Sequence, residues 1–159
     1  MPFRPPSSQI LAVPHVQQRR TGECLAACAF MICFYLQIAV DYQRLVRLLE
    51  IQDEVGVSFS KIHNLEKLRL TVVYQKDGTL AQLYNLLSAG WPVIISVQTK
   101  ELPYWHGIAS LHAVVLVGMD EEYVYLNDPE WPDAPIRVAI GDFDLALLAR
   151  GERFALLAP

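Results

Sequence analysis

Charged side chains are scarce in this sequence, and those of one sign never gather into a long run. Only 19% of the 159 residues are Asp, Glu, Lys or Arg, and the formal net charge is −4. The arginines are scattered or paired, as at Arg19 and Arg20, so the chain lacks the basic stripe that typically binds phosphates. We therefore expect no nucleic acid partner.

Cysteines are also few, with three in the whole chain, all between residues 24 and 33. An odd number confined to one short stretch is not typical of the disulfide framework of a small secreted protein. Cysteines on neighbouring turns of one helix are poorly placed to bridge. Free thiols and a reducing, cytoplasmic location are therefore expected.

The sequence has no apolar run that spans a bilayer comfortably, although residues 24–40 (CLAACAFMICFYLQIAV) come close. This run follows two arginines and so resembles a signal peptide or a short anchor. However, it contains Gln37, falls short of a span and precedes no clear small-residue cleavage site. A buried core helix explains the same residues, and we expect no membrane span.

The length and the absence of internal repeats or interior linkers indicate one domain with a substantial core. Residues 1–14 contain four prolines and two serines, which predicts an extended or disordered lead-in. The single domain is expected over residues 15–159.

Hydrophobic periodicity divides this domain into a helical first half and a second half rich in strands. Helices are expected at residues 24–37, after a cap at Asp41, after Ser58, after a cap at Thr79, and at 142–149. Strands are expected at residues 71–75, 92–98, 112–118, 123–126, 136–140 and 154–157. Helices followed by an antiparallel sheet predict an α+β fold.

The stretch TGECLAAC, residues 21–28, places Cys24 at the start of the first expected helix, after a candidate cap at Thr21 and a turn at Gly22. Free N–H groups and the helix macrodipole favour a thiolate at that position. Cys28 and Cys33 lie deeper in the helix, where apolar surroundings keep thiols protonated. Cys24 is therefore the candidate nucleophile, with core packing as the alternative interpretation of each cysteine.

A cysteine nucleophile needs a base and a group that orients the base, and the expected topology suggests both. His112 opens the apolar strand HAVVLVG, and Asp128 follows the next strand, YVYLN. If these strands form an antiparallel hairpin, the start of one lies beside the end of the other, and His112 and Asp128 become neighbours. A structural histidine and a turn residue before Pro129 are the alternatives.

Acyl transfer also needs hydrogen-bond donors for the negative charge that develops on a carbonyl oxygen. The backbone N–H of Cys24 is one candidate, and a side-chain amide upstream of the turn is a second. Gln17 and Gln18 both stand there, and residue type and position do not separate them.

Together these motifs resemble the C39-type (bacteriocin-processing, double-glycine) family of papain-like cysteine peptidases. The string QRRTGECLAAC, residues 18–28, is similar to the start of that family, with a glutamine six residues before the cysteine and an acidic residue directly before it. The resemblance covers most of residues 15–145. It continues through GWP at residues 90–92, HAVVLVG at 112–118 and LNDP at 126–129.

The resemblance implies a papain-like fold in which Cys24 is the nucleophile, His112 the general base and Asp128 the group that orients the base. It also implies that Gln18, rather than Gln17, is the oxyanion-hole donor. The substrate would be a peptide or protein, and neither a metal nor an organic cofactor would be needed. We expect a stand-alone domain, so the transporter role and leader specificity of the best-known members are not carried over.

One residue departs from the family's usual pattern. The family generally has glycine after the cysteine, whereas this chain has Leu25, a larger side chain that would narrow the groove beside the nucleophile. The substrate preference of the family is therefore not transferred to this chain.

Three other functions fit parts of the same sequence. An acyl or amide transferase on the same scaffold would resolve the acyl-enzyme with an amine, and a non-catalytic C39-like module would only bind peptides. A zinc site would use Cys24, Cys28, His112 and Asp128, although common zinc spacings place such cysteine pairs on a turn rather than along a helix.

Overall fold

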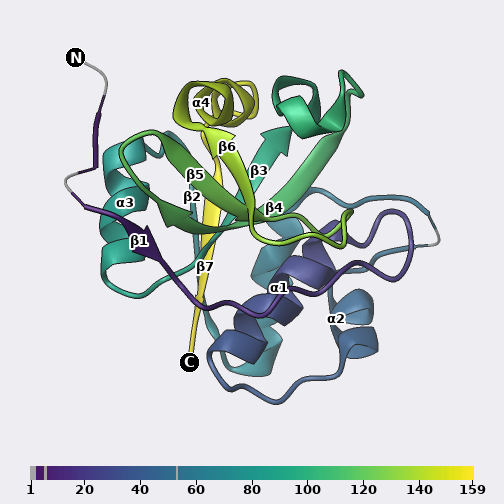
Figure 1. Ribbon diagram of the computed structural model, residues 1–159. Coiled ribbons are helices and arrows are strands. Elements are labelled where there is room, and N and C mark those ends of the chain that lie inside the picture. The colour runs from purple at the N-terminus through teal and green to yellow at the C-terminus, as the bar shows by residue number, and fades with distance from the viewer. Residues whose placement is uncertain (1–2, 6, 53) are drawn as a thin grey trace.

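The structure, a computed structural model, describes residues 3–5, 7–52 and 54–159 and places helices on both faces of one antiparallel sheet (Figure 1). The predicted lead-in over residues 1–14 falls partly outside the described residues, which omit 1, 2 and 6. Within it, Gln9–Ile10 form the short strand β1, which pairs with β4. This pairing attaches part of the lead-in to the sheet.

The sheet has seven strands in antiparallel pairs, in the order β2-β7-β3-β4-β5-β6, with β1 beside β4. The longer strands are β2 (Thr71–Gln75), β3 (Val93–Gln98), β4 (Leu111–Met119), β5 (Tyr123–Asn127), β6 (Ile136–Ala139) and β7 (Phe154–Ala158). These positions agree closely with the predicted strands. The prediction of an α+β fold with an antiparallel sheet is confirmed.

Helices precede and interrupt this sheet along the chain. They are α1 (Cys24–Tyr35), α2 (Tyr42–Leu48), α3 (Leu80–Ser88) and α4 (Ile140–Leu148), with short 3-10 helices η2 (Thr99–Glu101) and η3 (Pro103–Trp105) between β3 and β4. The helix predicted after Ser58 is instead a 3-10 helix, η1 (Phe59–Leu68). Its apolar residues recur every third position, a spacing that aligns side chains in a 3-10 helix.

The core lies in two layers, one on each face of the sheet. On one face α1, α2 and η1 pack against alternate strand residues such as Ala113 and Val115; on the other, α3 and α4 pack against Val114 and Leu116 (Figure 1). Because both faces are covered, β4 is buried along nearly its whole length without alternation. His112 is the second residue of this buried strand.

The apolar run that resembled a membrane anchor is α1, the central helix of the first layer. Eight of its twelve residues are buried, among them three alanines that let the helix approach the sheet closely. Among the described residues, no helix combines the length and apolar character needed to cross a bilayer.

The turn before α1 fixes where the helix begins. Gly22 has φ +87°, and a Cβ there would lie 2.9 Å from the carbonyl carbon of Val55. The predicted cap at Thr21 is wrong, because Glu23 occupies the N-cap position, without a capping bond from its side chain. Buried Glu23 instead accepts hydrogen bonds from the Arg20 N–H (3.1 Å) and the Tyr42 hydroxyl (3.0 Å). These contacts attach the start of α1 to α2.

Candidate active site

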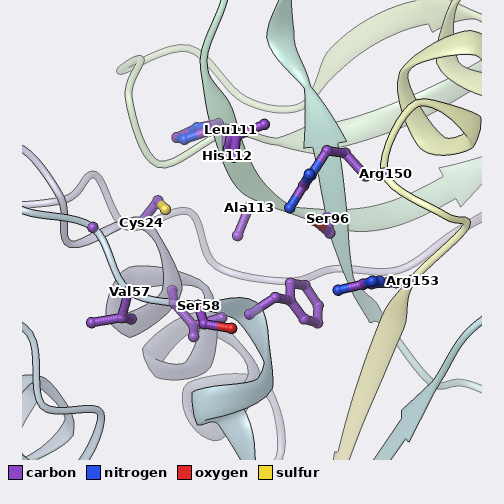
Figure 2. Close-up of a pocket in the computed structure, with 12 residues that line it drawn as sticks. Cys24, Val57, Ser58, Ser96, Leu111, His112, Ala113, Arg150 and Arg153 are labelled. Atoms are coloured by element: carbon purple, nitrogen blue, oxygen red, sulfur yellow. The ribbon is translucent and has the colours of Figure 1, made fainter.

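Cys24 is the first residue of α1, and its half-exposed thiol borders a cavity of about 470 Å³ (Figure 2). His112, at the start of β4, borders the same cavity from the sheet. The helical layer thus supplies one candidate group and the sheet supplies the other. The two side chains thus border one cavity from opposite layers.

His112 and Asp128 are in direct contact, as the predicted β4–β5 hairpin requires. The His112 Nε2 atom lies 2.7 Å from Asp128 Oδ1, and both side chains are buried, at 8% and 0% exposed. Since Nε2 is engaged with the carboxylate, Nδ1 is the ring nitrogen left for the thiol. The carboxylate therefore fixes both the orientation of the ring and the tautomer of its neutral form.

Among the described residues, four groups donate hydrogen bonds to the Asp128 carboxylate. Besides His112, the Glu130 N–H donates to Oδ1 at 3.0 Å, while the Tyr104 hydroxyl (2.6 Å) and the Trp105 indole N–H (3.0 Å) donate to Oδ2. Burial alone would raise the pKa of Asp128, but the hydrogen bonds and the charge of His112 lower it below its usual range. Asp128 therefore remains an anion.

Tyr104 and Trp105 were not predicted as partners of Asp128. Burial and the nearby Asp128 charge raise the pKa of Tyr104, so its hydroxyl keeps its proton and continues to donate. Their residue types were the one sequence signal for such contacts, because buried Tyr and Trp side chains usually form hydrogen bonds through their polar atoms.

His112 favours its charged form despite being buried. Burial acts to lower the pKa of the imidazole, but hydrogen bonds and negative charge from Asp128 and Cys24 outweigh it and raise the pKa to about 10. The Trp105 ring packs against the imidazole, with centroids 5.1 Å apart and a T-shaped geometry.

The other two cysteines are separated from this chemistry by burial. Both are inaccessible to solvent. Burial, followed by the charges of Cys24 and Asp128, raises the pKa of Cys28 well above its usual value, and burial raises that of Cys33 to about 11. These two thiols therefore stay protonated, as expected for core residues.

Gln18 is held by the segment that follows Asp128. Its backbone N–H donates to the Pro129 carbonyl (2.8 Å), and its side-chain Nε2 donates to Glu130 Oε2 (3.0 Å). The carboxylate identifies the amide nitrogen, because an oxygen facing it would be repelled. Gln17 is exposed, and its amide donates to the Glu130 carbonyl (2.8 Å). Only Gln18 thus has its amide positioned by a charged side chain.

The cavity wall beyond Cys24 and His112 includes residues that the sequence did not single out. Leu25, the departure from the family pattern, is 3% exposed and borders the cavity next to Cys24. Ser96, Arg150 and Arg153 border it as well (Figure 2). No sequence signal marked the two arginines, which lie 38 and 41 residues after His112.

A zinc site would need at least three ligating side chains grouped around one point. Within the part of the chain that the structure describes, no three His, Cys, Asp or Glu side chains are grouped so that they could hold a metal ion. Both oxygens of Asp128 already accept hydrogen bonds from the protein.

Comparisons with known proteins give a matching family and several similar solved structures. The Peptidase_C39 like family matches residues 10–138 of the chain. No curated protein shows significant similarity. Among solved structures, a candidate C39-like peptidase from Bacillus anthracis aligns with a TM-score of 0.77 at 22% identity, covering 96% of this chain and 98% of that one.

Two further solved structures are peptidases of transporters. A double-glycine motif protease from an AMS/PCAT transporter, solved with its leader peptide, gives a TM-score of 0.68 at 19% identity and covers 95% of this chain and 94% of that one. The peptidase domain of Streptococcus ComA, a bi-functional ABC transporter involved in a quorum-sensing pathway, gives a TM-score of 0.65 at 16% identity. This alignment covers 91% of this chain and 97% of that one.

These likenesses confirm the predicted papain-like fold, and the family match confirms the resemblance seen in the motifs. Membership supports a peptidase role in general terms. Because the match extends over most of the domain, from β1 into β6, the chain belongs to the Peptidase_C39 like family.

Proposed function

We propose that this protein is a cysteine peptidase that hydrolyses peptide bonds through an acyl-enzyme on Cys24. The observation that carries the proposal is the buried His112–Asp128 pair, because its imidazole borders the same cavity as a thiol at a helix N-terminus. Family membership adds general support for a peptidase.

In the first half of the reaction, the Cys24 thiolate attacks the carbonyl carbon of the scissile bond, and the carbonyl electrons move to oxygen. As the tetrahedral intermediate collapses, the C–N bond breaks and the His112 imidazolium gives its proton to the leaving amine. In the second half, neutral His112 takes a proton from water, which attacks the thioester and releases the acid. Cys24 and His112 return to their starting states.

Asp128 acts in this scheme without touching the substrate. Its hydrogen bond to Nε2 holds the ring so that Nδ1 serves the thiol and the leaving group, and its charge stabilises the imidazolium. The donors from Tyr104 and Trp105 prevent the carboxylate from rotating away from His112. A proton held on Nδ1 is thus directed at the reacting atoms.

Two donors are proposed for the oxyanion. The Cys24 N–H is among the first amides of α1, which have no partner within the helix. The Gln18 amide uses one N–H on Glu130 and has a second for the substrate oxygen. A donor aimed at developing charge contributes about 3 kcal/mol to the transition state.

The substrate is proposed to be a peptide or protein, bound without a metal or organic cofactor. One structural relative was solved with a leader peptide, which supports peptide recognition on this scaffold. The three free cysteines support action in a reducing compartment, which for this chain we propose to be the cytoplasm.

The direct test is a cleavage profile on proteome-derived peptides, with Cys24→Ala protein as the control. We expect a set of cleavages with the wild type that the variant does not produce. Adding a simple amine such as hydroxylamine tests the transferase alternative, since hydrolysis yields free acids as the main product. If wild type and Cys24→Ala give the same peptides, the peptidase proposal is wrong.

A further inference from the structure

Two arginines border the candidate active-site cavity on the side contributed by the end of the chain. Arg150 follows α4 and Arg153 precedes β7, and both side chains reach toward the cavity with Ser96 between them (Figure 2). The turn between them is fixed by backbone bonds, including Gly151 N–H to the Leu148 carbonyl (3.0 Å). The arginines are thus carried by a defined loop against the sheet.

Neither arginine has a protein partner for its charge among the described residues. No ion pair or side-chain hydrogen bond joins Arg150 or Arg153 to that part of the chain, and Glu152, between them in sequence, pairs with neither. The Nε atom of each is buried and lacks an acceptor. Buried N–H donors of a charged group normally have a hydrogen-bond acceptor, because burying them without one costs free energy.

The local charge is opposite to that of the whole molecule. The chain carries a net charge of −4, yet this wall of the cavity holds two cations. Among the described residues that line the cavity, none carries a carboxylate, and apart from Cys24, His112 and the two arginines they are apolar or neutral. An anionic group on a molecule in the cavity would supply the acceptor that the described lining residues do not.

A guanidinium presents its N–H groups in a fork that fits a carboxylate with two parallel hydrogen bonds. The cavity has a volume of about 470 Å³. A space of that volume is roughly 8 Å across, the length of two to three extended residues at about 3.4 Å each. A carboxylate on the arginines would therefore belong to a residue near the scissile bond.

We propose that Arg150 and Arg153 form a subsite for a carboxylate of the peptide substrate, within about two to three residues of the bond that Cys24 attacks. The proposal rests on the proposed peptidase function and names the substrate class as acidic near the cleavage point. The carboxylate is that of an Asp or Glu side chain or of a free C-terminus, since both offer the same acceptor. The Ser96 hydroxyl borders the same space and is available as a further donor.

The test uses two thiol-alkylating peptides that differ by one carboxylate: iodoacetyl-Gly-Glu-amide and iodoacetyl-Gly-Gln-amide. With the wild type we expect Cys24 to react at least about tenfold faster with the Glu reagent, the size expected for hydrogen bonds to a charged group. In the Arg150→Gln and Arg153→Gln proteins this ratio should fall toward one. Arg150→Lys and Arg153→Lys should keep part of it, because the charge remains.

The control is Arg44→Gln, which removes one positive charge from an exposed position away from the cavity. This variant should keep the wild-type ratio, so a change there would indicate a general charge effect and overturn the subsite. Iodoacetyl-Gly-Gly with a free or an amidated C-terminus forms a second reagent pair. A preference confined to the free-acid form assigns the subsite to a C-terminal carboxylate, and a preference confined to the Glu reagent assigns it to a side chain.

The outcomes separate this proposal from the proposed function. If Cys24 reacts selectively but equally with both reagents, the carboxylate subsite is wrong and the peptidase proposal stands. If neither reagent prefers Cys24 over Cys28 and Cys33, the nucleophile assignment fails. Binding of acetyl-Gly-Glu-amide and acetyl-Gly-Gln-amide to the Cys24→Ala protein measures the subsite without any reaction, and equal affinities there would also overturn it.

Discussion

Cys24 differs from its two neighbouring cysteines in exposure and in its partners. It is half-exposed at a helix start and interacts with a charged imidazole, whereas Cys28 and Cys33 are buried with raised pKa values. Nucleophilic reactivity requires the thiolate and access to it. These contrasts within one twelve-residue helix make the three thiols internal controls for one another.

We predict that iodoacetamide at mildly acidic pH modifies Cys24 at least about tenfold faster than Cys28 or Cys33, because only Cys24 combines access with an imidazolium partner. His112→Ala should slow the reaction at Cys24 by removing that partner. Peptide mass spectrometry after timed quenching measures the three rates. Equal rates at all three cysteines would contradict the assignment of Cys24 as nucleophile.

A second prediction concerns the two adjacent glutamines. Gln18→Ala should lower peptide turnover roughly a hundredfold, the usual effect of removing one oxyanion donor. It should leave iodoacetamide labelling of Cys24 nearly unchanged, because alkylation forms no oxyanion.

Gln17→Ala is the matched control, since both amides bond to Glu130 but only Gln18 contacts its carboxylate. Turnover by Gln17→Ala should stay close to wild type. A larger loss with Gln17→Ala than with Gln18→Ala would show that the oxyanion donor has been assigned to the wrong glutamine.

At the scale of elements, the first turn of α1 depends on close backbone packing. A Cβ at Gly22 would clash with the Val55 backbone at 2.9 Å, and its φ of +87° is unfavourable for other residues. The residue just before Cys24, Glu23, bonds to α2 through Tyr42. The position of the thiol therefore depends on contacts outside its own helix.

Gly22→Ala is predicted to lower the free energy of unfolding by about 1–3 kcal/mol, as expected for a strained backbone position. Gly141→Ala is the control, because a Cβ there meets nothing within 4 Å and alanine is favoured over glycine in a helix such as α4. Urea denaturation of both variants measures the difference. A Gly22→Ala protein as stable as wild type would show that the turn accommodates a side chain.

The sequence predicted most elements because the chain is locally consistent: apolar runs bounded by Gly, Pro and Asp became strands, and Thr79 capped α3. It predicted the His112–Asp128 contact because an antiparallel hairpin fixes which ends meet. The 3-10 geometry of η1 was missed, since over ten residues a spacing of three is hard to distinguish from 3.6. Local sequence patterns thus predicted the helices and strands. The pairing of antiparallel strands predicted the contact between His112 and Asp128.

The remaining parts of the site depend on long-range contacts that no local pattern encodes. The bond from Trp105 to Asp128 and the placement of Arg153 in the cavity join residues brought together only by the complete sheet. Whether an arginine is paired depends on every nearby carboxylate, which the sequence does not locate. The carboxylate subsite could therefore be inferred only from the structure.

On the scale of the whole molecule, the site lies between the helical layer and the sheet. Cys24 belongs to α1, whereas His112 and Asp128 belong to the sheet and the loop after β5. The interaction of His112 with Cys24 therefore joins the two layers, and its strength contributes to global stability. The pKa of His112, raised from 6.5 to about 10, links that stability to pH.

The direction of this dependence follows from the protonation of each state. Folded His112 keeps its proton up to about pH 10, whereas the unfolded side chain loses it near 6.5. The stabilisation is therefore complete below pH 6.5 and is lost progressively as the pH rises to about 10. The free energy of unfolding of the wild type, measured relative to His112→Gln by urea titration, should fall across this range.

The Cys24→Ala protein tests whether the Cys24 thiol contributes to the raised pKa of His112. Removing the hydrogen bond and charge of Cys24 leaves Asp128 as the partner that raises the pKa of His112, so the loss of stability should shift to lower pH. If the difference between wild type and His112→Gln does not change with pH, His112 is neutral in the folded protein. The ion pair proposed to start catalysis would then be absent, and His112 would have to act as a neutral base.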